Sequence, residues 1–532
     1  MAGGMAVPLT APGSYSAQDP ALQKICAVIR QFMAQDQCAP WIISDLDAAR
    51  MVANGEIANC QQSGRYIDSE ASLHEPIGDN IPYTSASVLS GRADDTALLM
   101  FSSGSTGDPK GVRLTHRQLL CNLAQIADRS ELVSSDRSLS WLPLTHDMGL
   151  VLFHLCHTLA GIAQYKMTPL TFARAPGSLL TLASELKASL LGMPNFGFDQ
   201  LNRLPETDDE HWQLGSVRLI YNGAEPIDPV LTRRFLARFS RYGLDRHVIC
   251  AGWGIAEACV VASILSCKQL AAFESLPTCW VRTGSALQVG SPVQICPPET
   301  PGALELAALG EPVHGLEVRV LDDTRRPLPL GHLGHLEIRG PNVTRGYYGQ
   351  PSLDWCPTGD IGFLHDGIVY LQGRAKDVLF INGRNFFSND LETALCHATN
   401  WPANQLAVVG HTDPLRRTEQ VVVFFRHGRS DGDSAPVAMR LQHALELILG
   451  YPPPSRFPRF PKQPAVRCGA LFCVMPCRKG ITTACCRKRP QWQPRRHLSS
   501  APSNNANWYW QSSFARYWGR RMPILPSTLP YR

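Results

Sequence analysis

The sequence predicts an α/β protein with a large first domain and a small second domain. Its 532 residues are enough for two or more domains with full hydrophobic cores. Apolar runs typical of buried strands end in loops rich in Gly and Ser, and stretches with helical spacing of apolar residues follow them. From Leu391 onward, a helix, two strands and a second helix follow one another and indicate a compact α+β unit.

The expected elements can be given in chain order. Helical spacing predicts helices over Gln23–Gln35, Arg117–Asp128, Gly149–Leu159, Leu391–Thr399 and Val437–Leu449. Apolar runs predict strands over Trp41–Ser44, Leu98–Phe101, Val217–Tyr221, Val248–Cys250, Gln405–His411 and Gln420–Arg426. We expect Gly334–Ile338 and Gly340–Tyr348 to form a hairpin.

The composition is that of an ordinary soluble globular protein, with 44% hydrophobic and 18% charged residues. No uninterrupted apolar run reaches the roughly 18 residues of a membrane-spanning helix. The first residues lack the basic segment of a signal peptide, and their apolar stretch is short. We therefore expect a cytoplasmic protein whose 17 cysteines are reduced thiols.

The net charge of +5 averages two unlike parts. Pro452–Arg532 contains 15 Lys and Arg residues and no Asp or Glu. The rest of the chain has 35 basic and 45 acidic residues, a net charge of −10. A basic tail with Trp508, Tyr509, Trp510 and Trp518 could bind nucleic acid, and a second interpretation of this tail is given below.

A loop rich in small residues follows the strand that ends at Phe101. Its residues are Ser102, Ser103, Gly104, Ser105, Thr106 and Gly107, and Lys110 comes soon after. Small residues let backbone N–H groups approach an anion, hydroxyls add donors, and the lysine adds charge. The loop is not a GxxxxGK[ST] loop, because no Ser or Thr follows Lys110. It is a candidate phosphate site; a flexible Ser/Gly turn is the alternative.

The order SSGSTGDPKGV resembles the phosphate-binding signature of the adenylate-forming superfamily of AMP-binding enzymes. SWLPLTHDMGL, MTPLTFARAP and GMPNFGFDQL are typical of its fatty-acyl-AMP ligases and of the acyl-loading domains of polyketide and peptide synthases. The resemblance implies that Lys110 and His146 act on the phosphates and the carboxylate. It also implies that Asn195 and Phe196 lie along the acyl pocket, although both could be ordinary core residues.

The same resemblance implies further site residues. The NGAEP segment would bind adenine through Asn222, Gly223, Ala224 and Glu225. Trp253 stands where relatives carry a Tyr that stacks on adenine, and Glu257 where they carry a carboxylate that binds Mg²⁺. Asp360 would hold the ribose hydroxyls, Arg374 would contact ribose and phosphate oxygens, and Asp377 would be the hinge before a mobile small domain. Taken one by one, each of these charges could equally be a surface turn residue.

The resemblance also implies a division of the chain. Residues 1–375 would form a large, two-lobed domain with a barrel-like part, and 376–461 an incomplete small α+β domain. AGGMAVPLTAPG resembles a motif that further sheet and helix precede in relatives, so we expect a truncated or mis-started amino terminus. A naturally short amino terminus is the alternative.

A catalytic lysine expected near the end of the small domain is missing. Relatives read roughly PKTTSGK there, and this chain reads PKQPAVRC from Pro461 to Cys468. If Lys462–Cys468 were encoded AAA CAA CCA GCG GTA AGG TGC, one extra A would give Lys-Thr-Thr-Ser-Gly-Lys-Val. We therefore expect residues 462–532 to be read out of frame and to form a disordered basic tail rather than a nucleic-acid-binding segment.

The resemblance implies that the protein uses ATP and Mg²⁺ to convert a carboxylic acid, of the fatty or polyketide type, to acyl-AMP with release of pyrophosphate. The acyl group would pass to the phosphopantetheine thiol of an acyl carrier protein in the biosynthesis of an antibiotic, toxin or other secondary metabolite. Free CoA is the alternative acceptor, and a remnant that binds ATP but turns over slowly is a second alternative. No nucleic acid and no membrane span are expected.

Overall fold

The computed structural model describes residues 5–9, 20–36, 42–44, 66–68, 91–102, 109–205, 211–273, 276–282, 287–301, 303–381, 384–402, 405–412, 419–425, 435–449, 473–476 and 481–485. Contacts within the chain divide it into two compact units. Unit 1 contains residues 1–8, 88–100 and 112–490, and unit 2 contains residues 9–87, 101–111 and 491–532. Each unit is described by itself.

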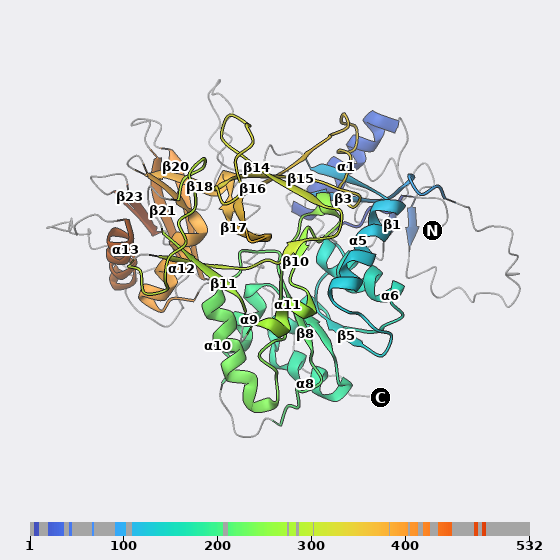
Figure 1. Ribbon diagram of the computed structural model, residues 1–532, viewed down its shortest axis with the longest axis horizontal. Helices are drawn as coiled ribbons and strands as arrows, with labels where there is room; N and C mark the ends of the chain where they lie inside the picture. Colours follow the sequence, from blue (N-terminus) through green and yellow to red (C-terminus); the bar gives the residue numbers. More distant parts are fainter. Residues whose placement is uncertain are drawn as a thin grey trace, which may run out of the picture. The chain divides into compact units, whose positions relative to one another are not determined.

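A seven-stranded sheet organises unit 1 (Figure 1). Its strand order is β13-β10-β9-β8-β7-β5-β6. Strands β5 to β9 pair in parallel, whereas β10 and β13 are antiparallel to their neighbours. The strands are β5 (Arg137–Ser140), β6 (Ala163–Lys166), β7 (Leu190–Gly192), β8 (Leu219–Asn222), β9 (Ile249–Trp253), β10 (Ser263–Ile264) and β13 (Glu311–Pro312).

Helices connect the parallel strands, as expected for crossover connections, and others precede or follow these strands. They are α5 (His116–Arg129), η1 (Met148–Cys156), α6 (His157–Leu159), α7 (Pro169–Arg174), α8 (Gly177–Leu186), α9 (Asn195–Asn202), α10 (Pro229–Phe239), η2 (Ser240–Tyr242), η3 (Ala256–Ala258) and α11 (Cys267–Ala272). Of these, α5, η3 and α11 precede or follow the parallel strands. Local sequence explains their ends. Thr115 and Gln118, for example, form a capping box at the start of α5, and Asp228 caps α10 ahead of Pro229.

Three further sheets are smaller. An antiparallel sheet has the strand order β14-β15-β16-β17. Its strands are β14 (Glu317–Leu321), β15 (Gly334–Arg339), β16 (Cys356–His365) and β17 (Ile368–Arg374). The other two sheets pair β11 (Thr278–Val281) with β12 (Leu304–Ala307) and β3 (Thr96–Ser102) with β4 (Lys110–Thr115). All sheets among the described residues are open, so the barrel-like part is not seen in them.

A second set of elements follows the turn η5 (Ala375–Asp377). It contains β18 (Val378–Ile381), β19 (Arg384–Phe387), α12 (Ser388–Thr399), β20 (Leu406–Thr412), β21 (Glu419–Phe425), α13 (Ala435–Leu449), β22 (Cys473–Pro476) and β23 (Ile481–Cys485). The buried apolar residues of unit 1 form two clusters, one between Ala97 and Tyr370 and one between Leu379 and Leu445.

The described residues of unit 2 include α1 (Pro20–Asp36), β1 (Ile42–Ser44) and β2 (Tyr66–Asp68). Strands β1 and β2 pair in parallel. Leu22, Cys26, Ile29 and Phe32 of α1 are buried at helical spacing, which is the apolar pattern that predicts this helix.

Most elements predicted from the sequence are confirmed, with shifts of a few residues at their ends. Three findings differ. Gly149–Leu159 begins as a π-helix before its last α-helical turn. The predicted hairpin is wrong, because β15 pairs with β14 and β16, and Gly340–Tyr348 contains no strand. Strands β22 and β23 lie beyond Lys462, where we expected disorder, and β23 pairs in parallel with β21. The β-branched residues of Ile481–Thr483 favour this extended conformation.

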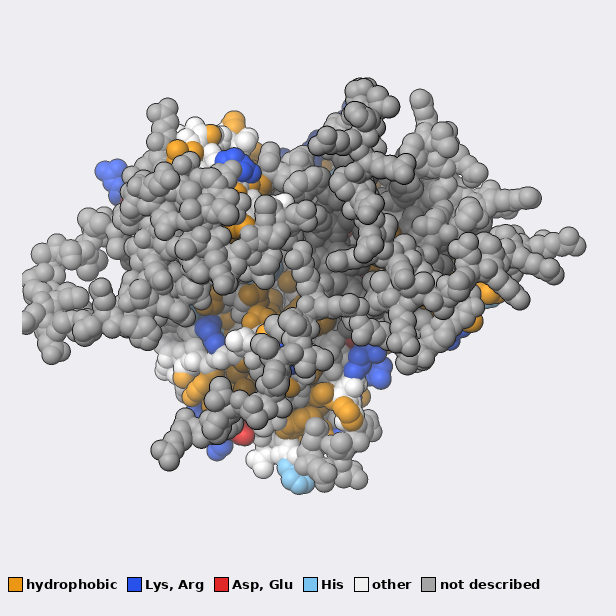
Figure 2. All heavy atoms as spheres, turned by 180° about the vertical axis from the view of Figure 1, so that it is seen from behind, with side chains coloured by type: hydrophobic (Ala, Val, Ile, Leu, Met, Phe, Trp, Pro, Cys, Tyr) orange, Lys and Arg blue, Asp and Glu red, His pale blue; other side chains and the backbone are white. Residues whose placement is uncertain are grey.

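No described helix is both long and apolar enough to cross a membrane. Ten cysteines between Cys26 and Cys396 are free thiols. On the face shown in Figure 2, the described surface displays hydrophobic and basic side chains, with few acidic ones between them.

Candidate functional site

Four strand ends define one edge of the main sheet. Strands β5, β7, β8 and β9 are parallel, so their carboxyl ends meet at the same edge. After β5 the chain forms β6 on one side, and then returns to form β7 on the other side of β5. Loops leave such a reversal point in opposite directions and open a crevice that commonly binds ligands.

The loop after β5 brings His146 and Asp147 to this edge. His146 Nδ1 lies 2.7 Å from Asp147 Oδ1, and the same Asp147 oxygen accepts a hydrogen bond from Met148 N at 2.7 Å. The carboxylate therefore caps helix η1 and orients the imidazole. The His146 side chain is 55% exposed, so it can reach a ligand.

The loops after β7 and β8 are joined by hydrogen bonds. Asn195 donates to the Pro226 carbonyl and accepts a hydrogen bond from Asp228 N. Phe196 N donates to Glu225 Oε1 at 2.8 Å. The predicted acyl-pocket residues and the NGAEP segment are thus parts of one bonded unit.

Three aromatic rings pack together beside this edge, where Phe172 is fully buried, Trp141 is nearly so and Phe196 is half-buried. Trp141, directly after β5, stacks on Phe172 with a centroid distance of 4.2 Å. The Phe196 ring meets both of them edge-on, at 6.3 Å and 6.4 Å. Trp141 and Phe172 were not among the residues predicted from the sequence, although each lies in a motif that resembles the family. Of these rings, only Phe196 is exposed enough to meet a ligand, and an apolar ring suits a hydrocarbon or aromatic acid rather than a charged one.

The last residue of β8, Asn222, is 2% exposed, and neither amide atom has a hydrogen-bond partner among the described residues. A buried polar group without a partner costs about 1–3 kcal/mol. Hydrogen bonds to a ligand would explain why this amide is buried. Ala224 has a positive φ of 73°. A Cβ at Gly223 would lie 3.2 Å from the Gly252 carbonyl oxygen, so Gly223 permits a close approach of β8 and β9.

Trp253, at the end of β9, connects this edge to the β14–β17 sheet. Its Nε1 donates to Asp360 Oδ2 at 2.8 Å, and Arg374 Nε lies 2.9 Å from Asp360 Oδ1. Burial raises the pKa of the Asp360 carboxyl, while Arg374 and the Trp253 N–H act in the opposite direction. Trp253 itself is 4% exposed, so little of its ring faces solvent.

Glu257 follows β9 by four residues, in η3. Its Oε1 accepts a hydrogen bond from the Tyr347 hydroxyl at 2.9 Å, and its carbonyl accepts one from Thr344 N. Burial and the Glu257 charge raise the pKa of Tyr347, so this phenol remains a donor. Tyr347 was missed by the sequence analysis, because only the fold brings it to a residue 90 positions away.

The candidate phosphate loop belongs to the other unit, and Ser103–Gly107 lie outside the described residues. Ser102 ends β3, and Lys110 begins β4 with an exposed side chain. Helix α1 bonds to both flanks of the loop: Lys24 Nζ donates to the Phe101 carbonyl at 2.6 Å, and Gln31 Nε2 to the Pro109 carbonyl at 2.8 Å. No sequence signal could have identified Lys24 and Gln31, since each is more than 70 residues from its partner.

Asp377, the expected hinge, closes the turn η5, and its carbonyl accepts a hydrogen bond from Ser388 Oγ at 3.2 Å. The structure therefore brings His146, Asn195, Phe196, Asn222–Glu225 and Trp253 to one sheet edge within unit 1. Through Trp253 it adds Asp360 and Arg374.

Comparison with known proteins agrees with this geometry. A sequence profile of the AMP-binding enzymes matches residues 26–348. FadD21 of Mycobacterium tuberculosis, named as a fatty-acid–CoA ligase, is 31% identical over 371 residues, which are 64% of this chain and 61% of FadD21. The long-chain-fatty-acid–AMP ligase FadD32 of Mycobacterium marinum is 30% identical over 362 residues, which are 60% of this chain and 56% of that protein. The chain thus spans less than two thirds of the length of these relatives.

A solved structure from work on the fatty acyl-adenylate ligases of E. coli and L. pneumophila has a TM-score of 0.70 to this chain. It is 24% identical and covers 86% of this chain and 80% of its own. This likeness confirms the predicted mixed α/β fold. The match of the family profile to more than half of the chain confirms the family: the chain belongs to the AMP-binding enzymes, the adenylate-forming superfamily.

Proposed function

We propose that this protein activates a carboxylic acid of the fatty or polyketide type by transfer of AMP from ATP, with release of pyrophosphate. The observation that carries the proposal is the single edge at the ends of β5, β7, β8 and β9. It brings together a half-buried aromatic ring (Phe196), an oriented histidine and a buried amide, and these suit an acyl chain, a carboxylate and a base. Membership of the AMP-binding enzymes supports the same chemistry.

The residues divide the work between the two substrates. Asn222 and the NGAEP backbone would bind adenine, and Trp253 would hold Asp360 toward the ribose while Arg374 reaches ribose and phosphate oxygens. Lys110 and the residues from Ser102 to Gly107 would bind the phosphates. Orientation of the acid carboxylate for in-line attack on the α-phosphate would supply much of the rate.

The carboxylate of the acid would lie near His146, with the hydrocarbon part toward Phe196, which packs against Trp141 and Phe172. The contact with Asp147 orients the imidazole through Nδ1, so His146 would present its Nε2 to the acid. Asn195 would not contact the acid directly; it would position the loop after β8 through its hydrogen bonds to Pro226 and Asp228.

Glu257 fits a Mg²⁺ ligand. Mg²⁺ in nucleotide sites is typically held by one or two carboxylates together with the phosphates, and the described residues contain no richer cluster of ligating side chains. The Tyr347 hydroxyl occupies Oε1, and no donor among the described residues bonds Oε2. When bound, Mg²⁺ would neutralise phosphate charge.

The acyl group would then pass to a carrier-protein thiol, with free CoA as the alternative acceptor. The separate apolar core between Leu379 and Leu445 supports a small domain that begins near Lys376, as proposed from the sequence. The PKQPAVRC segment lies outside the described residues, so a remnant that binds ATP and turns over slowly is the alternative for the chain as written.

ATP–pyrophosphate exchange with a panel of acids tests the first step, and addition of CoA or a carrier protein tests the second. We expect exchange that depends on an apolar acid. Lys268→Ala, which removes an exposed lysine on α11, is the control for Lys110→Ala. Nucleotide binding without exchange for any acid would support the remnant, and absence of both would refute the proposal.

A further inference from the structure

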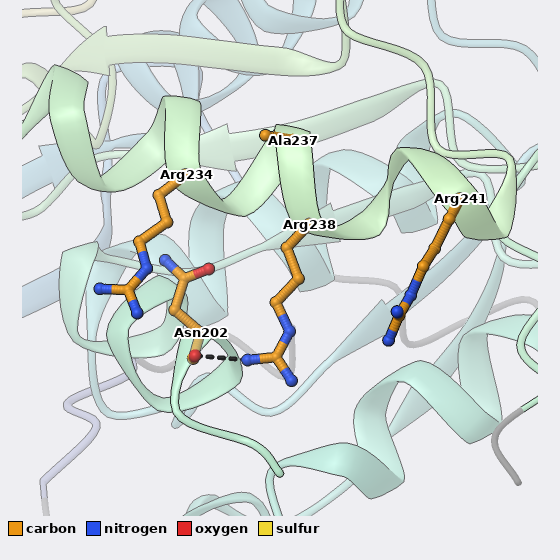
Figure 3. Close-up of a pocket in the computed structure, with 5 residues that line it drawn as sticks. All are labelled: Asn202, Arg234, Ala237, Arg238 and Arg241. Atoms are coloured by element: carbon orange, nitrogen blue, oxygen red, sulfur yellow. Dashed lines mark hydrogen bonds between the residues drawn. The ribbon is translucent and has the colours of Figure 1, made fainter. Parts of the chain in front are cut away.

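A hollow of about 400 Å³ lies beside α10, away from the candidate site. Its lining residues are Asn202, Arg234, Ala237, Arg238 and Arg241. Figure 3 shows the three arginines extending from the same side of α10 and η2, with Asn202 of α9 between Arg234 and Arg238. The volume is within the range of small-molecule sites, roughly 300–1,000 Å³.

Several other arginines of the described residues are paired with carboxylates, whereas no such pair is found for these three. Arg129, Arg203, Arg218, Arg233, Arg319, Arg339 and Arg374 each lie within 4 Å of a carboxylate. Arg234, which is exposed, has no polar partner among the described residues. Arg241 bonds to the Tyr242 hydroxyl and lies over its ring, and Arg238 donates to the carbonyls of Asn202, Leu204 and Pro205.

None of the three is therefore neutralised within the described residues. Arg238 is held in place by carbonyl oxygens, which accept its hydrogen bonds but leave its charge uncompensated. Its Nε is buried without a partner. A fixed guanidinium between two more exposed ones is an arrangement suited to phosphoryl oxygens, which guanidinium groups bind in bidentate fashion.

The spacing of the arginines indicates more than one phosphoryl group. Arg234, Arg238 and Arg241 are four and three residues apart, so they share one helix face and span about 10 Å along the axis. A single tetrahedral anion cannot bridge this span, whereas a chain of phosphoryl groups reaches more of it.

The hollow is separate from the candidate site. Helix α10 begins next to Asp228, at the carboxyl end of β8, and runs back toward the other edge of the sheet. Arg238 lies nine residues into the helix, about 14 Å from that start. We propose that this hollow binds a small ligand that carries two or more phosphoryl groups, independently of the ATP site.

Calorimetric titration of the full chain with inorganic tripolyphosphate tests the proposal. Every variant also carries Lys110→Ala, which should weaken binding at the phosphate loop. Because the basic tail also attracts anions, the test is the difference in tripolyphosphate affinity between variants. We expect Arg234→Gln with Arg241→Gln to remove one binding event or to weaken it at least about tenfold. Both side chains are exposed, and thermal unfolding checks the fold. Arg246→Gln, an exposed arginine outside the hollow, is the matched control and should change nothing.

Two further measurements can overturn the proposal. Sulfate at equal ionic strength should bind at least about tenfold more weakly, and equal binding would show non-specific attraction. The acidic residues Glu206, Asp208, Asp209 and Glu210 follow Pro205 in the sequence. If tripolyphosphate bound only after these four were changed to Gln or Asn, the chain's own acids would neutralise the arginines and the proposal would fail. Equal affinity in the double variant and in Arg246→Gln would also refute it. ADP in place of tripolyphosphate would show whether a nucleotide supplies the phosphoryl groups.

Discussion

Replacement of Trp253 by Phe isolates one hydrogen bond to a buried carboxylate. The substitution keeps an aromatic ring at the end of β9 and removes only the Nε1–H that donates to Asp360 Oδ2 at 2.8 Å. Asp360 is 4% exposed, so water does not replace the lost donor freely. Arg374 Nε, at 2.9 Å from Oδ1, would remain as the partner of the charged form.

The size of the effect follows from the charge on the acceptor. A hydrogen bond to a charged group contributes about 1.5–3 kcal/mol, which is about a tenfold or larger shift from carboxylate toward carboxylic acid. Burial already raises the pKa of Asp360, and the substitution raises it further. Because the folded-state pKa lies above the unfolded one, Asp360 favours folding most at low pH, and this contribution is lost as pH rises through the folded pKa. The variant should therefore lose about 1.5–3 kcal/mol of stability at pH 7.5 and clearly less at pH 4.

Denaturant unfolding at the two pH values measures this loss without reference to activity. In the proposed enzyme, the acidic limb of ATP–pyrophosphate exchange should also move to higher pH. Trp212→Phe is the control, because Trp212 Nε1 donates to the neutral hydroxyl of Thr181 at 3.1 Å. A loss of stability in Trp253→Phe that is independent of pH, or equal to that of Trp212→Phe, would show that Asp360 does not depend on the indole donor.

Four further predictions concern the proposed reaction and the small domain. Lys110→Ala should lower pyrophosphate exchange without loss of fold, and full exchange would contradict its role. Glu257→Gln should weaken the Mg²⁺ dependence of exchange, which a titration of Mg²⁺ measures. The Asp228 carboxylate, 3.5 Å from His397 Nε2, raises the pKa of His397, so this pair stabilises the protein at low pH and less as pH rises. His397→Gln should therefore lower the melting temperature more at pH 5.5 than at pH 8.5, and an equal change would count against the pair. Restoration of PKTTSGK and of the reading frame after it should raise acyl-AMP formation at least about a hundredfold, as expected for one transition-state donor. An equal rate in the unrestored chain would show that another residue replaces this lysine.

The amphipathic elements and the candidate site segments could be predicted from the sequence because they are local patterns. Helix α5 has both its apolar spacing and its capping box within one stretch of sequence. The predicted hairpin is wrong because an apolar pattern indicates a strand but does not specify which strand pairs with it. Pro341 lacks a backbone N–H, and Gly346 has a positive φ of 146°, so the segment after β15 turns away from β15 and makes only an isolated bridge between Tyr347 and Val112.

The contacts between Trp253, Asp360 and Arg374 could not be predicted in this way, because they depend on a register. Asp366 and Gly367 both have positive φ and close a two-residue turn between β16 and β17, which their Asp-Gly sequence favours. Regular pairing from His365 and Ile368 would place Gly373 opposite Asp360. An irregularity between Ile361 and Gly362 shifts the register by one residue, so Arg374 lies opposite Asp360 instead. The sequence motif contains the carboxylate and the guanidinium, but only the single extra residue in β17 places Arg374 opposite Asp360, where the two side chains pair.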